Sequence, residues 1–202
     1  VIDNGDGTYS SVFTGVLAGT ATTITGTVGG SAVTTTLPTV TVSPGTLSLA
    51  QSAITVSSSS VASGANVTLT LTARDAAGNS LTTGGSTVVF NRSGGTSTGT
   101  ISGTTDVGNG TYTATFTGVV SGTPTSITAT VGGAAVTSIS PTVTVVPGAI
   151  SLANSTISVS AATVASGSGV TLTLTGRDAA NNALTSGGSS ILFGFTGGTS
   201  TG

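Results

Sequence analysis

The sequence predicts an all-β chain of tandem immunoglobulin-like β-sandwich repeats of about 103 residues, with seven strands in each repeat. Three observations predict this fold class. The chain repeats itself at a constant offset, its apolar residues alternate with Thr or Ser, and glycine-rich turns separate the alternating stretches. Helical spacing of apolar residues is absent.

The internal repeat is the strongest signal. Residues 1–99 align with residues 104–202 at a constant offset of 103 positions and without gaps. Roughly six positions in ten are identical, which indicates a true repeat of one domain length. The stretch DNGDGTY at 3–9 returns as DVGNGTY at 106–112, and RDAA at 74–77 returns at 177–180.

Alternation sets the two faces of each expected strand. In the stretch VTLTLT at 67–72, Val and Leu are expected to face the core, and Thr68, Thr70 and Thr72 to face solvent. The expected strands lie near 53–57, 66–74, 86–91, 98–102, 111–117, 125–131 and 135–145. The residues expected to point inward are Val67, Leu69, Leu71, Val88, Phe90, Tyr112, Phe116, Ile127 and Val131.

Pro44-Gly45 and Pro147-Gly148 mark the expected unit boundaries, because each follows an alternating strand and precedes a turn-rich stretch. The predicted parts are the C-terminal half of an Ig-like repeat (1–45), a complete Ig-like repeat (46–147) and the N-terminal half of another (148–202). Such short linkers favour a semi-rigid rod.

Composition argues against catalysis. The chain has no Cys, His, Met, Trp, Lys or Glu, and its charged residues are five Asp and three Arg. Imidazole, thiolate and soft metal ligands are therefore missing. We expect no enzyme, no catalytic, cofactor-binding or metal-binding residue and no cofactor. Nucleic acid is also not expected as a partner, because phosphate binding needs clustered basic residues.

No apolar run reaches the roughly 18 to 20 residues of a membrane span. Residues 1–7 also lack the basic and apolar regions of a signal peptide. We therefore expect any export signal or anchor to lie outside this segment.

Asp3 and Asp6 sit in a D-N-G-D-G stretch that superficially resembles the start of a calcium loop. Calcium needs six to eight oxygens and commonly a bidentate Glu, and the second copy places Val107 and Asn109 at two loop positions. A turn in which Asp and Gly set the backbone before the following tyrosine is favoured.

That tyrosine, Tyr9 or Tyr112, is expected at a corner where its hydroxyl bonds to the backbone at the entrance of a strand; the alternative is simple core packing.

Arg74-Asp75 and Arg177-Asp178 form the charged pair that is present in both repeats. One interpretation is a recognition patch. The favoured interpretation is that Asp caps the following turn while Arg is solvated at the strand end.

Two further surface features stay open. N-x-S/T sequons occur at Asn66, Asn91, Asn109 and Asn154, which permits glycosylation but does not argue for it in a chain so rich in Asn, Ser and Thr. A further hypothesis, which is not favoured, is that the threonine rows 68, 70 and 72 lie beside 113, 115 and 117 and give a hydroxyl array of the kind an ice- or carbohydrate-binding face uses. Sheet twist opposes a flat lattice match.

The stretch VTLTLTARDAAGNSLTTGGSTVVF, within 64–90, resembles the bacterial Ig-like domains of the invasin and intimin family. The stretches DVGNGTYTATFTG, ITATVGGAAV and SPTVTV are similar to a filamin-type repeat. Together they cover most of each unit. The resemblance implies a sandwich used as spacer, scaffold or adhesive tip, and it carries no active residue across.

Three hypotheses on function follow. The first is a structural or adhesive repeat segment of a large extracellular surface protein or fibre, acting as a semi-rigid spacer. The second is a self-assembling filament subunit completed by strand exchange between copies. Copies are expected head to tail, with residues 148–202 of one copy meeting residues 1–45 of the next, either within one continuous polypeptide or between separate chains. The third is a carbohydrate-binding accessory module, which the scarcity of aromatic residues weakens. The receptor or glycan ligand is not identified.

Overall fold

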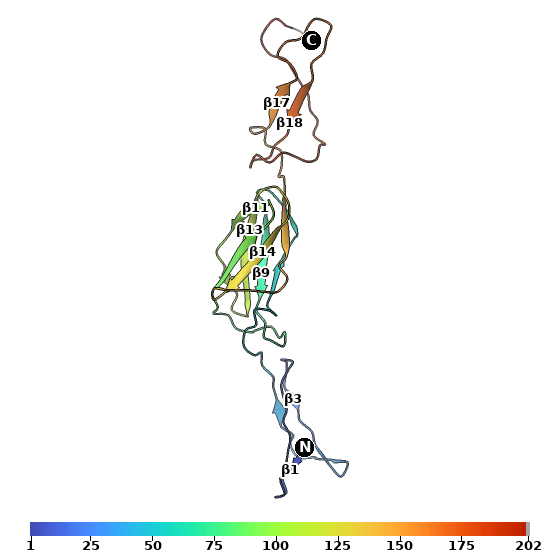
Figure 1. The fold of residues 1–202 in the computed structure, drawn as a ribbon. Coiled ribbons are helices and arrows are strands. Elements are labelled where there is room, and N and C mark those ends of the chain that lie inside the picture. Colours follow the sequence, from blue (N-terminus) through green and yellow to red (C-terminus); the bar gives the residue numbers. More distant parts are fainter. Residues whose placement is uncertain (201–202) are drawn as a thin grey trace.

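The computed structural model describes residues 1–200, so Thr201 and Gly202, the end of the predicted third part, lie outside the described residues. Figure 1 shows an elongated molecule in which a two-sheet sandwich lies between two thinner ends. We call the part from β7 (Ala53–Val56) to β16 (Thr142–Val146) the central sandwich, residues 1–45 the N-terminal arm and residues 148–200 the C-terminal arm. The two arms lie at opposite ends of the molecule (Figure 1).

The central sandwich has two sheets. In the first, the strand order is β11-β13-β9-β7, with β12 also paired to β13. Its strands are β7 (Ala53–Val56), β9 (Asn66–Thr72), β11 (Thr98–Ile101), β12 (Thr105–Asp106) and β13 (Thr111–Val120). The order in the second is β10-β14-β16-β8, with β15 paired to β14. Its strands are β8 (Ser60–Ala62), β10 (Val88–Ser93), β14 (Thr125–Val131), β15 (Ala134–Ala135) and β16 (Thr142–Val146).

The core lies between these sheets, and the predicted register is confirmed. All nine residues expected to point inward are buried, and Leu69, Phe116 and Ile127 are completely so. Thr68 on the opposite face of β9 is exposed. Because side chains alternate along a strand, a slip of one residue would have exchanged these two sets.

The prediction of one strand over 135–145 is wrong. Two strands, β15 and β16, occupy this region, and residues 136–141 between them include Pro141. Proline has no N–H to donate to a ladder, and β16 accordingly begins only after Pro141. The sequence also gave no sign of β8 and β12, which are three and two residues long. β8 pairs in parallel with β16, a long-range contact that alternation does not reveal.

The arms contain short strand pairs. In the N-terminal arm β1 (Ile2–Asp3) pairs with β2 (Tyr9–Ser10), β3 (Thr22–Thr23) with β6 (Thr39–Val40), and β4 (Thr27–Val28) with β5 (Ser31–Ala32). In the C-terminal arm β17 (Thr156–Val159) pairs with β18 (Leu172–Thr175).

Candidate functional site

The candidate site lies where the N-terminal arm meets the central sandwich, and it starts from the turn after β9. The Asp75 carboxylate closes this turn: its Oδ1 accepts hydrogen bonds from the N–H groups of Ala77 at 3.0 Å and Asn79 at 2.8 Å. Gly78 within the turn has φ +85°, a conformation that glycine adopts without strain. The prediction that Asp75 caps the following turn is therefore confirmed.

The other carboxylate oxygen of Asp75 faces the linker. Oδ2 accepts the N–H of Gly45 at 2.8 Å and the side-chain amide of Asn79, also at 2.8 Å. The carboxylate thus accepts four hydrogen bonds, and Asp75 is buried. A buried charge is tolerated when its oxygens are satisfied in this way, so the side chain fixes the residue that follows Pro44.

Asn79 carries the contact into the arm. Its Oδ1 accepts the N–H of Ala18 at 2.9 Å, and its Nδ2 donates to the carbonyl of Val16 at 2.8 Å. These partners lie 61 and 63 residues earlier in the chain. One buried side-chain amide therefore ties the arm backbone, the turn and Asp75 together.

The same arrangement occurs at the other end of the central sandwich. Asp178 Oδ2 accepts from Gly148 N–H and from Asn182 Nδ2, each at 2.8 Å. Asn182 Nδ2 also donates to the carbonyl of Val119 at 2.8 Å, and its Oδ1 accepts the N–H of Ser121 at 2.9 Å. We call each set a joint: the first is Asp75 and Asn79 with their partners, and the second is Asp178 and Asn182 with theirs.

Hydrogen bonding lowers the pKa of both joint aspartates. The pKa of Asp75 falls from 3.8 to about 2, first because the Asn79 side chain donates to the carboxylate. For Asp178, burial is the largest influence and by itself raises the pKa. The hydrogen bonds from Asn182, Gly148 and the turn outweigh burial, so that this pKa also falls from 3.8 to about 2. Both groups are anionic at neutral pH.

Sequence reasoning read Asn79 only as part of a turn and missed its contact with the arm. A signal was present, since Asn79 and Asn182 match across the repeats while Gly78 is replaced by Asn181. Asn181 keeps the left-handed conformation with φ 68°. Arg74 is half-buried, with its Nε shielded from solvent, and Arg177 donates from Nη1 to the carbonyl of Asn181 at 2.9 Å. Solvation of the arginine at the strand end stays a prediction.

The loop before each tyrosine is a turn. Gly5 N–H donates to Asp3 and Thr8 N–H donates to Asp6; Thr111 N–H donates to Asn109 in the second copy. The hydroxyl of Tyr112 accepts the backbone N–H of Ser86 at 3.1 Å, which confirms its expected corner bond. No cluster of three or more metal-binding side chains occurs within residues 1–200.

The predicted threonine rows do lie side by side, since Thr68 pairs with Thr115 and Thr70 with Thr113. Their use as a binding face stays a prediction, as does glycosylation at the sequons. The aromatic side chains of the central sandwich are turned inward: Phe90, Tyr112 and Phe116 are all buried.

Comparison with known families matches the sequence model for invasin, domain 3, to residues 48–148. The chain belongs to this family. The match spans the central sandwich together with the linker to the second joint. It confirms the resemblance to bacterial Ig-like domains, and it agrees with an all-strand sandwich.

Three solved structures of bacterial proteins are similar to this chain. The Escherichia coli adhesin FdeC is 30% identical with a TM-score of 0.55, and the match covers 81% of this chain and 52% of FdeC. Invasin, described as a bacterial integrin-binding protein, is 25% identical with a TM-score of 0.56, covering 83% of this chain and 34% of invasin. InvD of Yersinia pseudotuberculosis is 25% identical with a TM-score of 0.53, covering 84% of this chain and 53% of InvD.

The chain thus spans about half the length of the FdeC structure and a third of the invasin structure. Comparison with curated protein sequences gives no match. In the part of the chain that the structure describes, no helix is long and apolar enough to cross a membrane.

Proposed function

We propose that this chain is a semi-rigid stalk segment of a bacterial surface adhesin, made of tandem repeats that are joined at Pro44-Gly45 and Pro147-Gly148. One complete repeat runs from about residue 46 to residue 147. The observation that carries this proposal is the joint, which occurs twice with the same donors and acceptors and nearly the same distances. A stalk needs its units held at a repeated angle, and a hydrogen-bonded joint supplies that.

Each joint limits motion in two ways. The linker is short, and its glycine N–H is bonded to the buried aspartate. Asn79 or Asn182 then holds two backbone groups of the preceding unit. Swinging the units apart would leave these buried polar groups without partners, which costs roughly 1 to 3 kcal/mol for each group.

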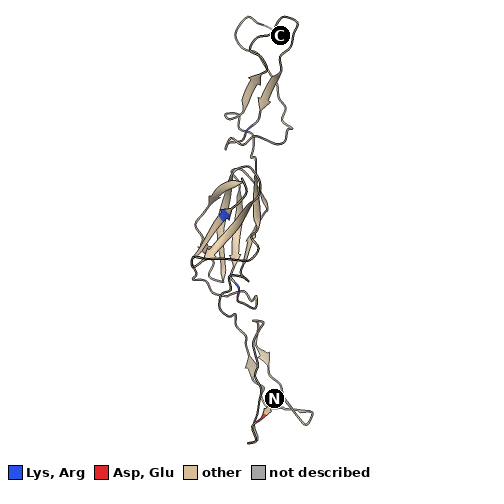
Figure 2. Ribbon diagram, viewed as in Figure 1, with Lys and Arg blue, Asp and Glu red and all other residues tan. Residues whose placement is uncertain are grey.

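The scarcity of charged residues supports a purely structural role. Figure 2 shows how sparse the charged residues are along the ribbon. The sequence contains five acidic and three basic residues in all. FdeC is described as an adhesin, and so is InvE of Yersinia pseudotuberculosis, a solved structure 26% identical to this chain with a TM-score of 0.50. From them we place this segment outside the cell, holding an adhesive part away from the surface and having no enzymatic activity of its own.

The test follows how rigidly the second joint holds the two units. Spin labels are placed at Ser60→Cys and Thr173→Cys, two exposed positions on either side of this joint. The chain has no native cysteine, so the labels are unique. Double electron–electron resonance measures the distance between the two labels. We expect one narrow distribution of this distance in the parent chain and a broader one in the Asn182→Ala variant.

The control is Asn91→Ala, which removes an exposed asparagine of β10 away from both joints and should leave the distribution narrow. The melting temperature of the central sandwich separates loss of the joint from unfolding, because Asn182 lies in the C-terminal arm. An unchanged distribution in Asn182→Ala, or a broad one in the parent chain, contradicts the proposal.

A further inference from the structure

The chain enters and leaves the central sandwich at opposite ends of that unit (Figure 1). The entering segment forms β7 and then β8, and the leaving segment is β16, which ends at Val146 immediately before Pro147. β8 and β16 pair directly with each other. Tension along the molecule therefore draws β8 toward one end of the sandwich and β16 toward the other.

The direction of this pairing decides how it resists tension. The two strands are parallel, with Ser60 opposite Thr144 and Ala62 opposite Val146. Pulling β8 from its beginning and β16 from its end slides the strands along each other, so all the hydrogen bonds of the ladder are stretched together. Pulling the two strands apart from the same end would instead open the bonds one after another.

The ladder between β8 and β16 is closed by a hydrogen bond at each end. The Thr144 N–H donates to the carbonyl of Ser59 at 2.9 Å, and the Ser63 N–H donates to the carbonyl of Val146, also at 2.9 Å. The side chains of Val61 and Val145, which lie opposite each other in the middle, are buried in the core. Sliding the strands would therefore disrupt buried packing as well as hydrogen bonds.

The other edge of β16 is held by the rest of the sandwich. The Val145 N–H donates to the buried Ser97 hydroxyl at 2.9 Å, and the Val145 carbonyl accepts the Gly122 N–H at 3.1 Å. Val143 at the beginning of the strand pairs with Thr125 of β14. β16 is thus fixed to its own sheet, and the sliding line under tension lies between β8 and β16.

The end of β8 is anchored beside the second joint. The Ser63 hydroxyl donates to the carbonyl of Val119 at 2.7 Å, and the same carbonyl accepts the side-chain amide of Asn182 at 2.8 Å. One carbonyl of β13 therefore holds both the end of β8 and the asparagine of the joint.

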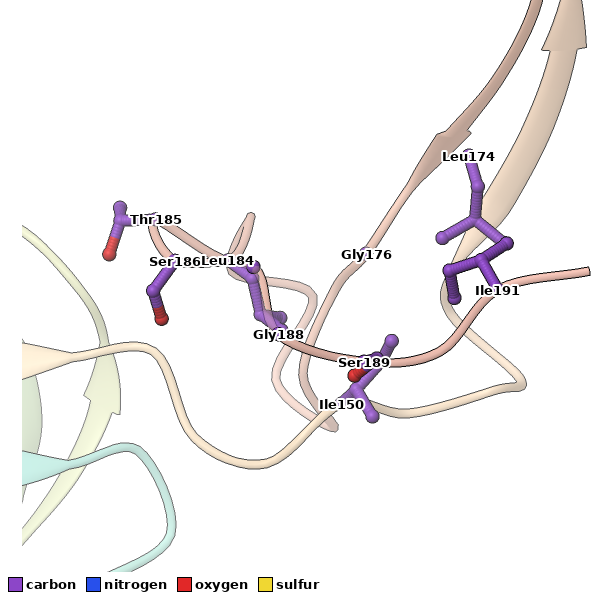
Figure 3. A pocket seen from close by; sticks show the side chains of 10 residues that line it. Ile150, Leu174, Gly176, Leu184, Thr185, Ser186, Gly188, Ser189 and Ile191 are labelled. Carbon is purple, nitrogen blue, oxygen red and sulfur yellow. The ribbon is translucent and has the colours of Figure 1, made fainter.

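Beyond the second joint the chain is bonded at once to the C-terminal arm. Ile150 forms a bridge with Asp178, and the Ser151 N–H donates to the carbonyl of Arg177 at 2.7 Å. Figure 3 shows Ile150 beside Ser189 of the same arm. Force that leaves β16 thus passes directly into the next unit.

We propose that the pair of β8 and β16 is the tension-bearing element of the central sandwich, with the Ser63–Val119 hydrogen bond anchoring its end. This inference rests on the proposed stalk function only for the direction of the load. Resistance to forced unfolding depends on the unfolding rate, so a few hydrogen bonds that must break together limit it even where they add little to equilibrium stability.

The test compares two directions of pulling on the full chain, which has no native cysteine, by optical tweezers attached at introduced cysteines. Thr46→Cys with Ala149→Cys, both exposed, loads the sandwich along the stalk. Ser58→Cys with Thr142→Cys, also exposed, loads the ladder from one end, since both positions lie at the start of the paired strands. At one constant force we expect at least about tenfold faster unfolding with the second pair, because each hydrogen bond is worth roughly a factor of five. Equal unfolding rates in the two directions would overturn the proposal.

A variant tests the anchor. Ser63→Ala removes the bond to the Val119 carbonyl and should unfold about fivefold faster when pulled along the stalk, the factor expected for one hydrogen bond. Pulled from the strand starts, it should match the parent, since Ser63 lies at the far end of the ladder. The matched control is Ser102→Ala, which removes the acceptor of the Thr115 N–H at the edge of the first sheet and should leave the rate along the stalk unchanged.

A Ser63→Ala chain that unfolds at the parent rate along the stalk, or a Ser102→Ala chain that unfolds as fast as Ser63→Ala, would contradict the proposal. Urea denaturation of each variant without load separates the anchor from a general loss of stability. A broad spin-label distribution at the second joint would contradict the stalk function alone, because both pairs of attachment points load only the central sandwich.

Discussion

The central sandwich and the arms contain nearly the same residues in different surroundings. Tyr112 and Phe116 are 2% and 0% exposed in the sandwich, whereas Tyr9 and Phe13, their equivalents in the N-terminal arm, are 68% and 55% exposed. Ile54 and its equivalent Ile157 in the C-terminal arm differ similarly, at 5% and 65%. Burial therefore follows from the opposing sheet and not from the residue itself.

Strands are also longer in the central sandwich than in the arms. β13 has 10 residues because β9, β11 and β12 all pair with it, while the equivalent stretch of the N-terminal arm is extended only at β2, with 2 residues. A strand is maintained by its ladder and its buried face, so alternation alone does not produce a long one.

The joints are the exception to this difference. Asp178 and Asn182 belong to an arm, yet they are buried as fully as Asp75 and Asn79. Their partners are the linker and the end of the preceding unit, which are present in both places. The contacts that join units form independently of the contacts that complete a sandwich.

The largest expected effect tests the core. Leu69→Ala should lower the free energy of unfolding of the central sandwich by about 2 to 5 kcal/mol, because Leu69 is completely buried. The same change at Leu172, its half-buried equivalent in the C-terminal arm, should leave this unfolding transition almost unchanged. Urea denaturation measures both. Thr68→Ala on the exposed face serves as control, with a change within about 0.5 kcal/mol.

A smaller effect is expected at the tyrosine corner. Tyr112→Phe leaves the Ser86 N–H without its acceptor and should destabilise the central sandwich by about 1 to 3 kcal/mol. Tyr9→Phe should have no effect on the same transition, since Tyr9 is exposed. Equal losses in the two variants would show that the arm tyrosine is already packed in solution.

The third prediction concerns the pH dependence of stability, and it tests whether the joint aspartate is held by its hydrogen bonds. The pKa of Asp75 is 3.8 ordinarily and about 2 in the fold, so its contribution to stability is fully present above about pH 4 and is lost as pH falls toward 2. Asp75→Asn should therefore be less stable than the parent at pH 5, with a gap that narrows steadily below pH 4. Denaturation midpoints at several pH values measure the gap. A gap independent of pH would mean that Asp75 is not held by these hydrogen bonds.

The sequence by itself determined which face of each long strand is buried, since the alternation of Val67, Thr68 and Leu69 has the period of a strand. It also predicted the turn at Asp75 and the tyrosine corner. Asp75 bonds to backbone groups only two and four residues further on, and the tyrosine corner is an arrangement that recurs in this kind of sandwich. These signals are local, and for that reason a single sequence contains them.

Only the tertiary structure decided which segments meet. It set β8 parallel to β16, divided the strand predicted over 135–145 into β15 and β16, and brought the Asn79 amide to Val16 and Ala18 more than 60 residues away. It also separated Tyr112 in a closed core from Tyr9 in an open arm, although the residues before them are nearly alike. The physical reason is that a hydrogen bond or a buried face needs a partner. The alternating pattern predicts whether a side chain is buried or exposed, but it does not identify the segment that the side chain contacts.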